Sequence, residues 1–209
     1  MSDQEMDVDA LRTELDQIKD AMGIQERYAG ATTVWLLFGV LVPVAAGVSQ
    51  YVHLEQLPPW LHWVSWLGVI GGGYVLWWTV SNDAGDLAVT AAGKPNVLLQ
   101  FGLVYLAAVP IQVIVGAYTP DLGYYAESAL VLSVIVVLLG VAYGVLGSSL
   151  AAYYIRRRDR LAFYVGTAWM VALGVAIPQS VTLEKWAYAV FGAAYFLYAF
   201  GTYLWLSRG

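Results

Sequence analysis

Long apolar stretches dominate the chain after residue 27, and polar residues gather in short segments between them. A membrane-spanning helix needs about 20 mostly apolar residues, and six stretches reach that length without a single Asp, Glu, Lys or Arg inside them. The pattern therefore predicts an all-α integral membrane protein whose residues 28–209 form a six-span membrane domain. The spans are predicted at approximately 29–52, 60–80, 96–118, 129–154, 162–182 and 186–206.

Residues 1–27 follow a different pattern, in which apolar positions recur at alternating spacings of three and four. This spacing is typical of a helix with one coiled-coil-like seam, and the segment lacks the basic start and apolar core of a signal peptide. We expect a short, acidic, amphipathic helix in the cytosol. It either docks on a partner protein or a second copy, or lies on the protein's own cytosolic face or on the membrane surface. The predicted seam consists of Val8, Leu11, Leu15, Ile18 and Met22.

Composition agrees with the membrane class and excludes several others. The chain is 60% hydrophobic and 12% charged, whereas soluble domains have about 25% charged residues. A disordered chain and a nucleic-acid-binding protein, which needs a basic face, are also excluded. The absence of cysteine excludes disulfides and Cys-ligated metals. Nine aspartates against three lysines resemble the composition of proteins from salt-loving archaea.

Basic residues give the expected orientation, because loops on the cytosolic side carry an excess of Lys and Arg. If the N-terminus is inside, nine of the ten bases flank the inner ends of the spans and only Lys185 flanks the outer ends. Trp and Tyr, which favour membrane interfaces, lie near both ends of the spans. We therefore predict a cell-membrane protein with both termini in the cytoplasm.

An internal repeat is visible in the spans. Prolines at positions 43, 110 and 178 lie in the odd-numbered spans, 67 and 68 residues apart, and each is expected to kink its helix. The even-numbered spans carry the pairs Gly71–Tyr74, Gly140–Tyr143 and Gly192–Tyr195. The simplest interpretation is three two-helix hairpins in a parallel repeat. This topology is similar to that of the HdeD-like family of small six-span membrane proteins.

Two carboxylates follow the second span in the string Asn82-Asp83-Ala-Gly-Asp86. Residues three apart share one helix face, and carboxylate oxygens suit Mg²⁺. The string resembles the start of the first Asp-rich motif of UbiA-type membrane prenyltransferases, which implies Mg-diphosphate binding and a lipid-modifying activity. Thr90 stands where that motif has a further acid, and a second Asp-rich motif is absent. The alternative is a polar loop that caps a helix.

A run of arginines follows the fourth span. The positive-inside pattern explains it, and an anionic-lipid or phosphate site is the functional alternative. The candidate residues are Arg156, Arg157, Arg158 and Arg160.

Polar side chains inside the spans give a further candidate site. Gln50, Gln112 and Gln179, together with Ser49 and Ser180, lie towards the outer ends of the kinked spans. Because a buried polar group without a partner is costly, these side chains should face each other or a wet cavity. They predict either hydrogen bonding within the bundle or an outward-facing pocket for a small or amphiphilic solute.

The two histidines, His53 and His62, flank one outer loop with Glu55 between them. These types can bind a metal or act as a pH switch, but a solvated interfacial loop is the expected state. Serines at the inner end of the fourth span cannot share a proton with them. No lysine within a span is available for a Schiff base.

Together, these sequence features favour a non-enzymatic membrane protein without a cofactor. The first hypothesis is a scaffold or partner subunit that uses its N-terminal helix. The second is a small transporter or an amphiphile-binding protein with the glutamine-lined pocket, and the third is a Mg²⁺-dependent lipid-modifying enzyme at Asp83 and Asp86.

Overall fold

The computed structural model describes residue 14 and residues 31–73, 75–76, 97–119, 121–153 and 155–208. These residues form helices joined by short turns, which confirms the predicted all-helical class. The five residues of the N-terminal seam and the pair Asp83 and Asp86 lie outside the described residues.

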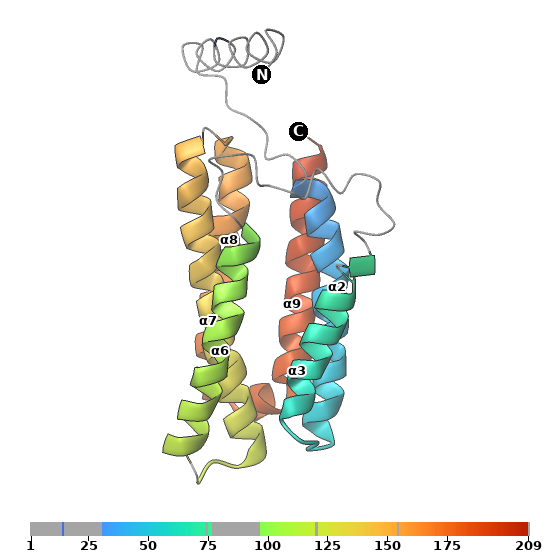
Figure 1. Cartoon of the computed structure of the whole chain (residues 1–209), viewed down its shortest axis with the longest axis vertical. Helices are drawn as coiled ribbons and strands as arrows, with labels where there is room; N and C mark the ends of the chain where they lie inside the picture. The colour runs from blue at the N-terminus through green and yellow to red at the C-terminus, as the bar shows by residue number, and fades with distance from the viewer. Residues whose placement is uncertain are drawn as a thin grey trace, which may run out of the picture.

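The helices run in nearly continuous succession where the chain is described (Figure 1). Three of the α-helices continue at their C-terminal end into a short π-helical or 3₁₀-helical segment. The elements are α2 (Ala31–Leu54), α3 (Trp60–Trp66) with η1 (Leu67–Gly71), α6 (Val97–Tyr118), α7 (Tyr124–Ser149) with η2 (Leu150–Tyr153), α8 (Arg157–Ala176) with η3 (Ile177–Gln179), and α9 (Val181–Ser207).

Four helical segments are long and apolar enough to cross a membrane, and Gly102–Tyr118 is a shorter apolar helix. The coarse prediction of a protein with membrane-spanning helices is thereby supported, whereas the count of six spans stays a prediction. Several helices extend beyond the apolar stretches that predicted them into polar flanking residues, as α8 does at Arg157. The four segments are Trp35–Leu54, Tyr124–Ser149, Arg157–Gln179 and Val181–Ser207.

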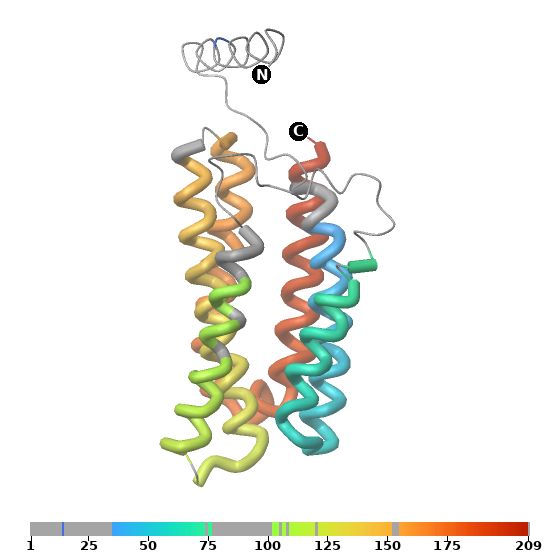
Figure 2. Tube along the Cα trace, in the orientation of Figure 1, coloured from blue at the N-terminus to red at the C-terminus, as the bar shows by residue number. Residues whose placement is uncertain are grey.

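The helices pack as two halves. In one half α2 lies along α9 and α3 packs on α2; in the other α7 lies along α8 and α6 packs on α7 (Figures 1 and 2). The two most extensive pairings, α2 with α9 and α7 with α8, join helices from different predicted hairpins. The packing therefore does not group the helices into three hairpins, and the hairpin repeat stays a prediction.

Close approach within a half depends on small residues, as expected for helices packed in lipid. A Cβ atom added at Gly174 on α8 would lie 2.8 Å from the carbonyl oxygen of Ser133 on α7. One added at Gly192 on α9 would lie 2.8 Å from the Cβ of Ala46 on α2. Neither contact leaves room for a larger residue.

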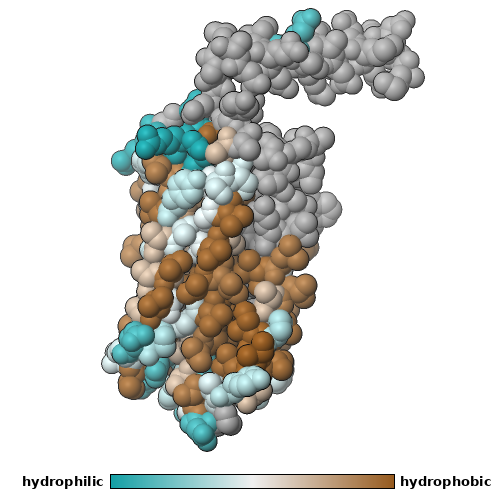
Figure 3. All heavy atoms as spheres, turned by 90° about the vertical axis from the view of Figure 1, so that its left-hand side faces the viewer, coloured by the Kyte–Doolittle hydropathy of each residue, from teal (hydrophilic) through white to brown (hydrophobic). Residues whose placement is uncertain are grey.

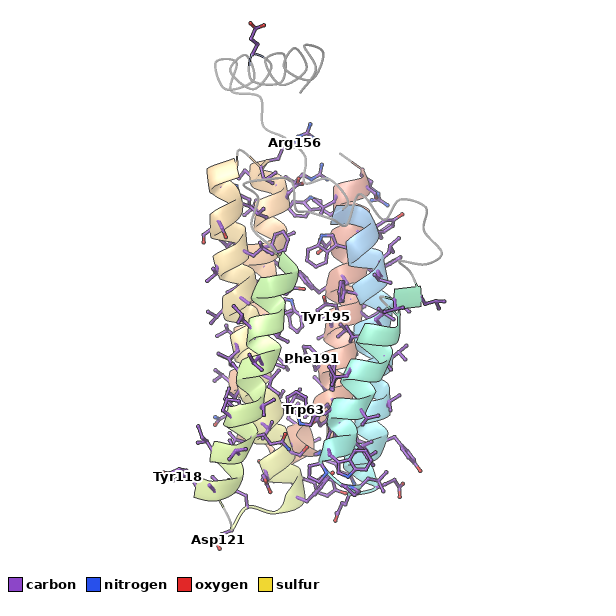
Figure 4. All side chains as sticks on the ribbon, in the orientation of Figure 1. Trp63, Tyr118, Asp121, Arg156, Phe191 and Tyr195 are labelled. Carbon is purple, nitrogen blue, oxygen red and sulfur yellow. The ribbon has the colours of Figure 1, made fainter. Side chains whose placement is uncertain are left out.

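Aromatic side chains fill much of the space between the two halves. Trp35 of α2 contacts the rings of Tyr143, Phe163 and Tyr198, with centroid distances of 5.3–6.1 Å. Figure 4 shows Tyr195 between the halves, and its hydroxyl lies 2.8 Å from that of Tyr143. These two tyrosines belong to two of the Gly-x-x-Tyr pairs, so the pairs place hydroxyl groups at the interface between the halves.

The two ends of the bundle differ in chemistry. Arg156 lies at one end and Asp121 at the other (Figure 4), and we call these the basic end and the Asp121 end. Hydrophobic side chains cover much of the middle of the face in Figure 3, and hydrophilic ones gather towards its upper and lower ends. This distribution is compatible with a bundle whose middle lies in a bilayer.

Candidate functional site

The turn after α2 brings the two histidines together at the Asp121 end. The N–H of Leu57 donates to the carbonyl of Val52 and that of Gln56 to the carbonyl of His53, and Gln56 has a φ of 50°. This is the Schellman arrangement that ends many helices. It reverses the chain into α3, so that the rings of His53 and His62 lie 6.5 Å apart.

His53 is completely buried, which corrects the expectation that both histidines lie in a solvated loop. Its Nε2 lies 2.9 Å from the carbonyl oxygen of Glu184, and its Nδ1 lies 3.2 Å from the hydroxyl of Ser128. Since a carbonyl only accepts, Nε2 carries the proton, and Nδ1 of a neutral ring accepts from the Ser128 hydroxyl. Both ring nitrogens are thus engaged, and His53 joins α2 to α7 and α9.

Gln50, one turn before His53 on α2, is hydrogen-bonded to the backbone of α9. Its Nε2 donates to the carbonyl of Lys185 at 2.9 Å, and its Oε1 accepts from the N–H of Ala189 at 2.9 Å. In a regular helix these two backbone groups, four residues apart, would bond to each other. The amide of Gln50 is inserted between them where α9 bends, at Trp186 with φ −108° and ψ 16°. An inserted side chain is a recognised cause of a helix kink.

His62 is held differently from His53. Its ring stacks on Tyr188 with a centroid distance of 4.7 Å and an interplanar angle of 9°. Both of its ring nitrogens are buried and have no hydrogen-bond partner. Most buried polar atoms in folded proteins are paired, and an exception requires an explanation.

His62 is also among the residues that line a cavity of about 80 Å³. The cavity is partly open to the surface and lies between the halves, bounded by α3, α6, α7 and α9. Figure 4 shows Trp63 and Phe191, two of its lining residues, between the halves. Its walls are mainly apolar, and its polar lining residues are His62, Gln112, Tyr124, Glu127, Ser128 and Tyr188.

The volume limits what the cavity can hold. A cavity of about 150 Å³ accommodates benzene, and one water occupies about 30 Å³ of liquid. The cavity of about 80 Å³ therefore matches two or three waters, or a polar group with two or three carbons. A larger molecule can enter only with one end, through the open side.

The three glutamines predicted to share a pocket are placed apart. Gln112 lines the cavity and accepts a hydrogen bond from Nε1 of Trp63. Gln50 is used at the α9 kink, and Gln179 is exposed at the end of η3. Among the three predicted pocket glutamines only Gln112 lines this cavity. The side-chain amide of Gln50 is bonded to backbone groups of α9, and the side chain of Gln179 is exposed.

The arginine run does not form one exposed cluster. Arg156 and Arg157 are exposed, whereas Arg158 and Arg160 are partly buried. The guanidinium of Arg158 donates to the carbonyl of Trp205 and lies over its ring, 5.2 Å from the centroid.

A metal site at the histidines is not supported. Within the described residues, no three His, Asp or Glu side chains gather as metal ligands, and both nitrogens of His53 are engaged.

Sequence reasoning missed Ser128, Tyr124 and Tyr188 as site residues. The sequence analysis gave these three residues no role, and no local signal shows that Tyr188 stacks on His62. Comparison of the chain with protein-family models, curated proteins and solved structures found no match.

Proposed function

We propose that this protein is a multi-pass membrane protein that binds the hydroxyl end of a single-chain amphiphile in the His62 cavity, as a binding or transport protein. The observation that carries the proposal is the pair of buried, unpartnered ring nitrogens of His62 on the wall of a partly open cavity. A ligand that supplies the missing hydrogen bonds gains affinity from groups that are otherwise left unsatisfied.

The chemistry of the ring favours a hydroxyl group. A neutral imidazole has one donor and one acceptor, and a hydroxyl can both accept and donate. The side-chain amide of Gln112 offers a second hydrogen-bonding group on the same wall. An anionic headgroup is disfavoured, because no Lys or Arg is among the described lining residues and burying an unpaired charge is far more costly than burying a hydroxyl.

The walls favour an aliphatic chain behind the hydroxyl. Val131, Ile135 and Leu139 of α7 line the cavity at successive turns, which forms an apolar path along the helix. Each methylene that leaves water contributes about 0.8 kcal/mol. The small volume admits a chain end more readily than an aromatic ring.

We further propose six spans in the cell membrane with both termini in the cytoplasm, so that the Asp121 end and its cavity face outwards. The excess of bases at one set of span ends supports this orientation, as do the opposite positions of Arg156 and Asp121 (Figure 4). Both residues are exposed. Because the chain has no cysteine, Asp121→Cys and Arg156→Cys give clean labelling sites.

An impermeant maleimide should label Asp121→Cys in intact cells and Arg156→Cys only after permeabilisation. The opposite pattern contradicts the orientation. Asp159, by contrast, is buried and unsuitable for this test.

The binding proposal is tested with two matched probes, 1-decanol and its methyl ether 1-methoxydecane. The thermal midpoint of the protein in mild detergent should rise with 1-decanol and respond much less to the ether, which accepts but does not donate. At one hundred times the Kd, a ligand stabilises a protein by about 2.7 kcal/mol.

Two variants sharpen this test. His62→Phe keeps a ring against Tyr188 but removes both nitrogens, and it should abolish the preference for 1-decanol. Gln179→Leu is the control, because Gln179 is exposed and does not line the cavity. Equal responses to the two probes in the unaltered protein, or an unchanged preference in His62→Phe, contradict the proposal.

A further inference from the structure

A second hollow lies between α8 and α9, near the basic end. It has a volume of about 240 Å³, three times that of the His62 cavity, and its lining is almost entirely apolar. It is an open groove where α8 of one half meets α9 of the other, and it is separate from the partly open His62 cavity. We call it the α8–α9 groove, and it is lined by Ala162, Val165, Leu197, Tyr198, Gly201, Thr202 and Trp205.

Small residues create the groove. Ala162 on α8 and Gly201 on α9 contribute little or no side chain, and a Cβ added at Gly201 would meet nothing within 4 Å. Val165 and Leu197 stand beside this space with 54% and 70% of their surface exposed. Both helices are among those apolar enough to span a membrane. In a bilayer, a groove on their outer surface would face the acyl chains of lipids.

Positive charge lies next to one end of the groove. Arg158 precedes Ala162 by four residues, one turn towards the basic end on the same face of α8. Its guanidinium is fixed over Trp205, itself a lining residue. Arg208, which is exposed, lies three residues after Trp205, directly after the end of α9.

Arg158 also has donor capacity left. It bonds one backbone carbonyl through a terminal nitrogen, while its Nε is buried and has no hydrogen-bond partner. A guanidinium carries five N–H donors in a planar fork that matches phosphate oxygens. A phosphate beside the guanidinium would accept from its remaining N–H donors and bring a negative charge to a positive end.

We propose that the α8–α9 groove binds one anionic phospholipid from the leaflet at the basic end. One acyl chain lies between Val165 and Leu197, and the phosphate accepts hydrogen bonds from Arg158, with Arg208 adding attraction. The arginines favour the anionic headgroup of this lipid, and the apolar walls of the groove favour its acyl chain. The site is independent of the His62 cavity, which lies at the other end of the bundle.

The test is native mass spectrometry of the full chain in mild detergent with an equimolar mixture of phosphatidylglycerol and phosphatidylcholine of identical acyl chains. The unaltered protein should carry at least five times more phosphatidylglycerol than phosphatidylcholine. Arg158→Gln should reduce this ratio to near one, because only the headgroup contact is lost. Val165→Trp should reduce the binding of both lipids, because it fills the groove.

Two controls match these variants. Arg156→Gln removes an exposed arginine that does not line the groove, and Val175→Trp adds the same bulk at an exposed position of α8 outside the groove. Both should keep the preference within about twofold of the unaltered protein, and thermal midpoints verify folding of each variant. Should Arg158→Gln fail to fold after losing its contact with Trp205, Val165→Trp still tests the groove and Arg208→Gln the charge.

Equal amounts of the two lipids on the unaltered protein would overturn the proposal. So would an unchanged lipid load in folded Val165→Trp, which would place the lipids elsewhere on the surface. A full preference for phosphatidylglycerol in folded Arg158→Gln would overturn the assignment of the phosphate to this residue.

Discussion

Apart from the α8–α9 groove, which opens to the outside, the interface between the two halves of the bundle is filled towards the basic end and hollow towards the Asp121 end. In the filled part, a Cβ added at Gly166 would lie 2.5 Å from the hydroxyl oxygen of Tyr198 and 2.7 Å from Cδ1 of Tyr143. In the hollow part, Trp63, Trp66 and Phe191 leave a cavity of about 80 Å³ among them and their neighbours. One interface thus contains both close packing and unfilled space.

The polar groups follow the same division. In the filled part the hydroxyl of Tyr198 donates to the carbonyl of Ala162 at 2.7 Å, and the hydroxyls of Tyr143 and Tyr195 are bonded to each other. In the hollow part the ring nitrogens of His62 have no partner. These tyrosine hydroxyls are paired, although Nε1 of Trp169, whose ring contacts Tyr195 and Tyr198, has no hydrogen-bond partner. Only the hollow part has an unpartnered ring beside a cavity.

The largest expected effect comes from overfilling the filled part. Gly166→Val should lower the free energy of unfolding by about 3 kcal/mol, because extra carbons in a close-packed contact force neighbouring side chains and backbone to move. Val131→Phe, which adds bulk at the cavity, should change it by about 1 kcal/mol or less, because it enters unfilled space. Thermal or denaturant unfolding in detergent measures both. Similar losses in the two variants would remove the distinction between the parts.

The next effect concerns the α9 kink. Gln50→Leu removes both bonds to the separated backbone groups of α9 and should cost about 2 kcal/mol, since each unsatisfied buried group costs about 1–3 kcal/mol and relaxation of the kink recovers part of this. Gln112→Leu, in the cavity wall, should cost about 0.6 kcal/mol, the average for a side-chain hydrogen bond in a membrane protein. Hydrogen exchange should become faster at the Ala189 amide in Gln50→Leu only. Unchanged exchange at Ala189 would argue against the inserted amide.

A smaller effect is expected at Tyr188. Tyr188→Phe keeps the ring that stacks on His62 but loses the hydroxyl that lies 3.1 Å from the Ser128 hydroxyl. The loss should be about 1 kcal/mol, a typical net value for one hydrogen bond. The thermal midpoint in detergent measures it. A loss as large as that of Gly166→Val would show that the hollow part is as tightly constrained as the filled one.

The smallest effect is expected at His62 itself. His62→Phe should leave stability unchanged or raise it slightly, because it replaces buried nitrogens that have no partner with carbon. The thermal midpoint without added ligand gives the result. A clear loss of stability would mean that the nitrogens of His62 already have partners in the folded protein, and the ligand proposal would lose its basis.

The sequence predicted the helical class and the apolar character of the spans, because hydrophobicity over some 20 residues is a strong local signal. It also predicted that Gln50, Gln112 and Gln179 either bond within the bundle or share an outward-facing pocket. It did not separate Gln112 from Gln50 and Gln179, because three glutamines near span ends look alike until the helix contacts are known. The burial of His53 was missed for the same reason, since Ser128 and the carbonyl of Glu184 are more than 70 residues away.

The pairing of the helices also could not be predicted from the sequence. The proline spacing suggested hairpins, whereas the most extensive packing joins α2 to α9 and α7 to α8. The partner seam at residues 8–22 and the carboxylates Asp83 and Asp86 lie outside the described residues and stay predictions. Deletion of residues 1–24 followed by identification of copurifying proteins tests the seam.

The most direct test of the central claim is photolabelling with a long-chain alcohol that carries a diazirine on the third carbon from the hydroxyl. In lipid nanodiscs, peptides that contain residues 59–66 and 124–139 should carry the label, and excess 1-decanol should compete it away. His62→Phe should lose this labelling while keeping the background on other surfaces. Labelling spread evenly over the lipid-facing helices, or confined to the α8–α9 groove, would contradict a binding site at the His62 cavity.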